Sequence, residues 1–98
     1  KSNKDPFSSL QLLKHGADVS RILDYQGFLK SPEESAINNK LQSIVPSYYG
    51  MEIKGVGPGS CSFYTGESPP PAKSVVSGKY YFNSESNICT LNYKLWLK

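Results

Sequence analysis

From Cys89 onward, every second residue of the chain is apolar. Successive side chains of a β-strand point to opposite sides, so every second residue shares one face. One face of such a strand would carry Cys89, Leu91, Tyr93, Leu95 and Leu97. The other face would carry Thr90, Asn92, Lys94 and Trp96. The pattern predicts a long strand with one side on a core.

Shorter strands are predicted before it. After Pro46, the spacing of apolar residues changes from the helical period of about 3.6 to the strand period of two. Tyr49, Met51 and Ile53 alternate with Tyr48, Glu52 and Lys54. β-Favouring residues also predict strands over 61–65 and 79–82 and a short edge strand over 75–76. Polar or glycine-containing segments predict turns over 55–60, 77–78 and 83–87.

A helix is predicted near the N-terminus, over 6–15. Asp5 can cap its free amides, and Pro6 suits the first helical position. Apolar residues follow at three-residue spacing, at Phe7, Leu10 and Leu13. Gly16 can supply a left-handed cap after His15. Two continuations fit the pattern: the helix runs on through Gly16, or Asp18 caps a second short helix that ends at Gly27.

A second helix is predicted over 32–45. Ser31-Pro32-Glu33-Glu34 combines an N-cap serine, a first-turn proline and a glutamate three residues on, which make a capping box. One face then carries the apolar residues Ile37, Leu41, Ile44 and Val45. Helices followed by strands predict a single α+β domain over 1–98, with a helical part over about 5–46 packed on an antiparallel sheet of about four strands over 47–98.

Cys61 and Cys89 are the two cysteines of the chain. Both occupy strand-like positions rather than a C-x-x-C motif, which favours one disulfide and an oxidising compartment. The alternative is two free buried thiols. A domain of 98 residues has a narrow stability margin, so one covalent tie would matter.

Composition excludes some classes of partner. The net charge of +3 is dispersed and too small to indicate nucleic acid. The longest uncharged run, 55–66, is rich in glycine and serine, so neither a transmembrane segment nor a signal peptide is predicted. For a disulfide protein, that pattern and the polar start at Lys1 are typical of a mature or trimmed chain.

The sequence offers no pattern of catalytic or metal-binding residues. His15 is the one histidine, and no G-x-S-x-G motif accompanies it. Four-ligand zinc spacing is absent, and the carboxylates fit caps, turns or solvent-facing positions. We therefore expect neither an enzyme nor a cofactor.

Two features suggest a contact surface. Three prolines in the segment 67–73 make a stiff, exposed loop that cannot donate to a sheet. Trp96 lies on the sheet's second face, where it marks a docking surface if exposed and packing if covered. The candidate contact residues are Pro69, Pro70, Pro71, Lys73 and Trp96. Lysines and aromatics also interleave over 79–82 and 93–96, but the core claims about half of these rings, which argues against nucleic acid.

With this order of elements, the chain resembles the globular headgroup of a type IV pilin or pseudopilin without its hydrophobic N-terminal half-helix. The likeness covers the helical start, the irregular connection, the antiparallel sheet and a cysteine in the last strand, within Ile88-Cys89-Thr90-Leu91-Asn92-Tyr93. The segment 77–87, with glycine, paired aromatics and a polar turn, also looks like a hairpin of pilin-like proteins. The interruptions at Gly16 and Gly27 depart from the long helix of that family.

The resemblance implies a structural role in a bacterial extracellular filament. The absent helix would anchor the subunit in the inner membrane before assembly and then pack in the filament core. The headgroup would face outward, contacting other pilin subunits and a host or surface receptor. Two alternatives are a free secreted binding or inhibitor module that uses the loop 67–73, and a small hydrolase that uses His15 as its base.

Overall fold

The computed structural model describes residues 9–71 and 74–98. Its helices are α1 (Ser9–Tyr25) and α2 (Glu34–Ile44), and a 3-10 turn, η1, spans Gly59–Cys61. The strands are β1 (Tyr49–Val56), β2 (Phe63–Gly66), β3 (Val76–Ser84) and β4 (Asn87–Leu97). Helices therefore precede a four-stranded antiparallel sheet, which confirms the predicted α+β class.

The last strand lies inside the sheet, whose order is β2-β1-β4-β3. On one side β4 pairs with β1, from Tyr49 opposite Leu97 to Val56 opposite Thr90. On the other side β4 pairs with β3 along its length. The short strand β2 covers only the second half of β1, with Glu52 opposite Gly66.

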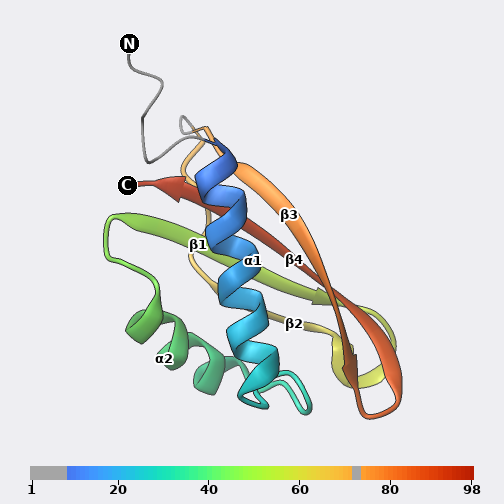
Figure 1. Ribbon diagram of the computed structural model, residues 1–98. Coiled ribbons are helices and arrows are strands. Elements are labelled where there is room, and N and C mark those ends of the chain that lie inside the picture. The colour runs from blue at the N-terminus through green and yellow to red at the C-terminus, as the bar shows by residue number, and fades with distance from the viewer. Residues whose placement is uncertain (1–8, 72–73) are drawn as a thin grey trace.

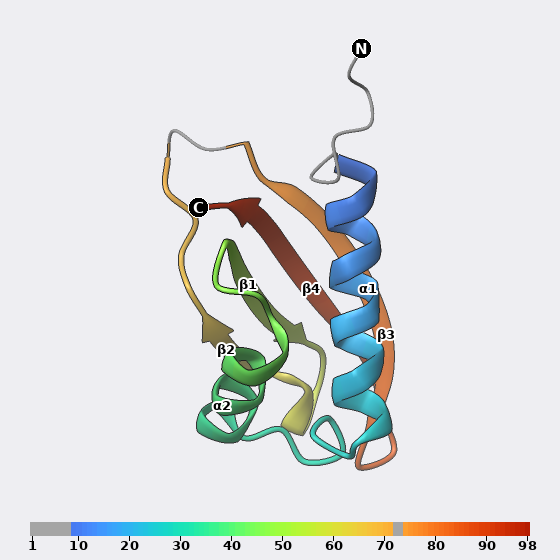
Figure 2. The ribbon, with the colours of Figure 1, turned by 60° about the vertical axis from the view of Figure 1, so that its left-hand side comes forward.

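Both helices cover the same face of the sheet, α1 over β3 and β4 and α2 beside β2 (Figures 1 and 2). The core between these layers includes Leu12, Val19, Leu23, Ile37, Leu41, Met51, Ile53, Phe63, Phe82, Leu91, Tyr93 and Leu95. The alternation predicted for the last strand is confirmed, because its apolar face is buried from Cys89 to Leu95. Neither of the two described helices lies on the opposite face of the sheet (Figure 2).

The first helix does not end at Gly16. Gly16 is buried in the middle of α1, where the helix crosses β4, and a β-carbon built on it would lie 2.2 Å from Cε1 of Tyr93. The missing side chain thus lets the helix approach the sheet closely. The expected end at His15 was wrong, and the continuous alternative is correct. The expected start at Asp5 and Pro6 lies outside the described residues.

The capping box at Ser31 was also wrong. α2 begins at Glu34, its N-cap is Glu33, and no side chain caps it. The hydroxyl of Ser31 instead donates to Glu85 at 3.0 Å, which joins the α1–α2 connection to the tip of the β3–β4 hairpin. A long-range contact has replaced the local one.

The expected turn at Ser77-Gly78 is part of β3, where these residues pair with Lys94 and Tyr93. The turn between β3 and β4 is tighter than predicted. It consists of Glu85 and Ser86, with φ of 49° and 74°. Positive φ at both central residues is what a type I′ turn requires, the turn that joins twisted strands well.

Cys61 and Cys89 form the predicted disulfide, with Cα atoms 5.3 Å apart. Cys61 lies in η1 rather than in the strand 61–65, and β2 begins at Phe63. The disulfide therefore ties the β1–β2 connection to the start of β4. Near it, the buried hydroxyl of Ser84 donates to the carbonyl of Lys30 at 2.7 Å and lies 2.6 Å from the hydroxyl of Ser60.

Candidate functional site

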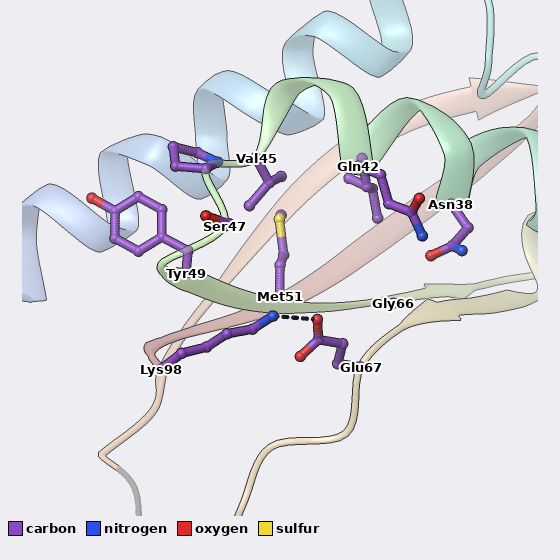
Figure 3. A pocket seen from close by; sticks show the side chains of 11 residues that line it. Asn38, Gln42, Val45, Ser47, Tyr49, Met51, Gly66, Glu67 and Lys98 are labelled. Carbon is purple, nitrogen blue, oxygen red and sulfur yellow. Dashed lines mark ion pairs between the residues drawn. The ribbon is translucent and has the colours of Figure 1, made fainter.

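A groove opens between α2, the start of β1 and the end of β2 (Figure 3). Its volume is about 480 Å³. It is lined by Asn38, Leu41, Gln42, Val45, Pro46, Ser47, Tyr49, Met51, Gly66, Glu67 and Lys98. Helix spacing places Asn38 and Gln42 on one side of α2, because residues four apart are neighbours on a helix surface. β1 and β2 supply the opposite wall.

The groove has an apolar floor and a polar rim. Met51 is buried and points toward Val45 between the helix and the strand (Figure 3). On the far rim, the ammonium of Lys98 lies 2.8 Å from a carboxylate oxygen of Glu67. About half of each side chain is exposed, so the ion pair contributes at most about 1 kcal/mol of stability and can open to meet other groups.

The chemistry of this groove suits binding to another protein. Amide groups, one ammonium and one carboxylate surround an apolar floor, and interfaces combine such an apolar centre with a polar rim. The sequence patterns did not predict this groove. The Glu67–Lys98 ion pair joins two segments far apart in the chain, and no local pattern reports such a contact.

The proline-rich loop starts at this groove. Glu67 lines the groove and is also the first residue of the loop 67–73. Pro69 is half-buried, whereas Pro70 and Pro71 are exposed. Lys73, the remaining loop residue of the predicted contact surface, lies outside the described residues. Three of the predicted contact residues, Pro69, Pro70 and Pro71, thus begin two residues after Glu67, which lines the groove.

Trp96 is buried, with 1% of its surface exposed. Its indole lies over Gly50, the residue opposite it in β1, and a β-carbon on Gly50 would lie 2.2 Å from Cε2 of the ring. The ring therefore packs against backbone instead of facing solvent. We leave Trp96 out of the contact surface for this reason.

His15 lies on α1 with its ring centroid 4.9 Å from that of Tyr49. Its Nε2 is buried and has no hydrogen-bond partner among the described residues. Burial lowers the pKa of His15 below 6.5. The negative charge of Asp18 raises this pKa, but its effect is smaller than that of burial. Burial therefore favours the neutral imidazole, and the ring lies against that of Tyr49.

Neither described helix is long and apolar enough to cross a membrane. Within residues 9–71 and 74–98, no three histidine, cysteine or carboxylate side chains gather as metal ligands. No protein family, curated protein or solved structure matches this chain.

Proposed function

We propose that this chain is the outward-facing globular part of a bacterial extracellular filament subunit of the type IV pilin kind. The observation that carries the proposal is the placement of α1. This helix lies along the sheet and begins at the end of the domain opposite the disulfide-tied tip of β3 and β4 (Figures 1 and 2). A helical anchor preceding α1 would therefore extend from the end of the domain opposite that tip.

The first turns of α1 support a partner beyond this domain. Leu10 is 76% exposed, although Leu12 two residues on is buried against the sheet. A single exposed leucine is common on protein surfaces. Leu10 supports the proposal because it lies at the end of the domain where an N-terminal helical anchor would join. In a filament, this end of the domain would pack against neighbouring subunits and cover Leu10.

The groove beside α2 would make a second subunit contact. It combines an apolar floor with the Glu67–Lys98 rim, and the exposed prolines Pro70 and Pro71 follow Glu67 closely in the chain. Prolines bind at low entropic cost because their backbone is already restricted. A side chain of the next subunit would fill the groove.

The gene provides the first test. The encoded residues before Lys1 are expected to include about 20 to 25 consecutive apolar residues, enough for a membrane-spanning helix. A cleavable signal peptide directly before this domain would contradict the proposal.

A substitution in the groove provides the second test. Gln42→Arg places a charged side chain over the apolar floor and should abolish or strongly reduce surface filaments while leaving the cellular level of the subunit unchanged. Asn39→Arg is the matched control, because Asn39 is an exposed amide on the same helix outside the groove. Equal filament yields for the two variants would remove the groove from the proposal.

A free secreted binding module is the competing function, and the exposure of Pro70 and Pro71 is the observation that favours it. In that case the domain would be recovered as a monomer from the medium, and alanine at Pro69, Pro70 and Pro71 would abolish binding to its partner. Retained binding after these three substitutions would dispose of this alternative.

A further inference from the structure

The face of the sheet opposite the two described helices carries a cluster of lysines. Lys54 of β1 and Lys79 of β3 both lie opposite Asn92 of β4, one on each side. Strands lie about 4.8 Å apart, so the backbones of these two lysines are about 10 Å apart. Lys94 follows two residues after Asn92, about 7 Å along the same strand. The three cations form a triangle on one open surface.

These side chains surround a shallow hollow of about 520 Å³. Lys54 and Lys79 are exposed, and no ion pair involves either of them among the described residues. The short polar side chains of Ser77 and Asn92 line the hollow between the lysines. Two unneutralised cations beside open polar groups make an electrostatically favourable place for an anionic ligand.

A carboxylate and an aromatic ring complete the hollow. Glu52 lies 3.9 Å from the ammonium of Lys94 and accepts a hydrogen bond from the hydroxyl of Tyr64 at 2.7 Å. Only 16% of the Glu52 side chain is exposed, so its remaining acceptor capacity favours a ligand that donates hydrogen bonds. The hydrogen bond also holds the half-exposed ring of Tyr64 in place beside Lys54.

We propose that this face, defined by Lys54, Lys79, Lys94, Glu52 and Tyr64, binds an acidic polysaccharide. Such a polymer brings anionic groups for the lysines and hydroxyl donors for Glu52 in the same repeating unit. The deoxyribose-phosphate backbone of DNA offers phosphates for the lysines but no free hydroxyl between them to donate to Glu52. The combination of cations with a buried hydrogen-bond acceptor therefore favours the polysaccharide.

Polysaccharide binding would add a ligand to the proposed function, but it depends only on the residues of this face. A filament subunit could fail to bind polysaccharide, and a secreted monomer could bind it. Binding by the purified 98-residue chain is measured without cells or filaments, so failure of one proposal is distinguishable from failure of the other.

The experiment measures binding of the disulfide-bonded chain to immobilised polygalacturonate, with dextran as the uncharged polymer and a 30-nucleotide oligo(dT) as the competing polyanion. We expect binding to polygalacturonate that weakens with added salt, little binding to dextran and weaker binding to oligo(dT). Absence of binding to polygalacturonate above the dextran level would overturn the proposal, as would stronger binding to oligo(dT).

Single substitutions locate the site. Lys54→Gln and Lys79→Gln should each weaken binding about two- to fivefold, the range of an exposed charge contact. Lys30→Gln is the matched control, since Lys30 is exposed in the connection between the two helices and its loss changes the net charge equally. All three variants should unfold at the wild-type temperature. An equal loss for Lys30→Gln would mean that net charge alone attracts the polymer, which would overturn the site.

Discussion

Gly16 and Tyr93 are in direct contact where α1 crosses the central strand of the sheet. A β-carbon on Gly16 would lie 2.2 Å from Cε1 of Tyr93 and 2.8 Å from Cδ1 of Leu95. The hydroxyl of Tyr93 also donates to the carbonyl of Leu13 at 3.2 Å. One aromatic side chain therefore holds the helix at a distance that only glycine allows at position 16.

Replacing this glycine should weaken the fold. In an exposed helix, Gly→Ala usually stabilises by about 1 kcal/mol, but here the added methyl group collides with a buried ring. We expect Gly16→Ala to lower the free energy of unfolding by about 1 to 3 kcal/mol in urea titrations. Ser35→Ala, at an exposed position of α2, is the control and should change it little. A Gly16→Ala protein as stable as the wild type would show that α1 does not pack this closely.

The turn between β3 and β4 offers a stabilising substitution. Glu85 and Ser86 both have positive φ, which costs residues with a side chain about 1 kcal/mol or more each. Ser86→Gly should therefore raise the free energy of unfolding by up to about 1 kcal/mol.

Ser77→Gly is the matched control for that substitution. Ser77 is an exposed serine inside β3, where glycine should destabilise by about 0.5 to 1 kcal/mol. Thermal unfolding of both variants tests the pair. A loss of stability in Ser86→Gly would contradict the assigned turn.

The disulfide should account for a large share of the stability. Cys61 and Cys89 are 28 positions apart and both buried, and closing a loop of this length stabilises by about 3 to 4 kcal/mol on the chain-entropy account. Urea titrations with and without reductant, together with the Cys61→Ala/Cys89→Ala variant, measure this. Coincident unfolding curves for the oxidised and reduced protein would refute the expectation.

Stability should also depend on the protonation of His15. Burial lowers its pKa in the folded protein, so the unfolded chain binds the proton first, near pH 6.5. The contribution of the neutral imidazole is complete above that pH and is lost as the pH falls through the folded pKa.

Unfolding free energies at pH 7.5, 6.5 and 5.5 test this dependence. The wild type should lose more stability over this range than His15→Gln, in which the titrating group is absent. Parallel losses in the two proteins would show that His15 does not contribute.

Local patterns predicted much of this fold. The alternation from Cys89 onward depends only on strand geometry, and it correctly gave the buried face of β4. The α+β class and the disulfide followed from the order of the patterns and from the presence of two cysteines. These features need no knowledge of what each segment contacts.

The errors share one cause, which is contact between distant segments. In the sequence Gly16 resembles a helix cap, but in the structure it packs against Tyr93 inside the helix. Ser31 resembles an N-cap, but its hydroxyl donates a hydrogen bond to Glu85 instead. The groove was missed for the same reason, because its rim pairs Glu67 with Lys98. The cluster of Lys54, Lys79 and Lys94 also depends on the register of the strands, which places Lys54 and Lys79 on either side of Asn92.

The central claim is that this domain is exposed on an assembled filament. The most direct measurement is immunogold electron microscopy of intact cells, with antibody raised against the folded, disulfide-bonded domain and cells lacking the gene as control. We predict gold particles along surface filaments that are absent from the control cells. Filaments that remain unlabelled, with the domain recovered only as a monomer in the medium, would contradict the account.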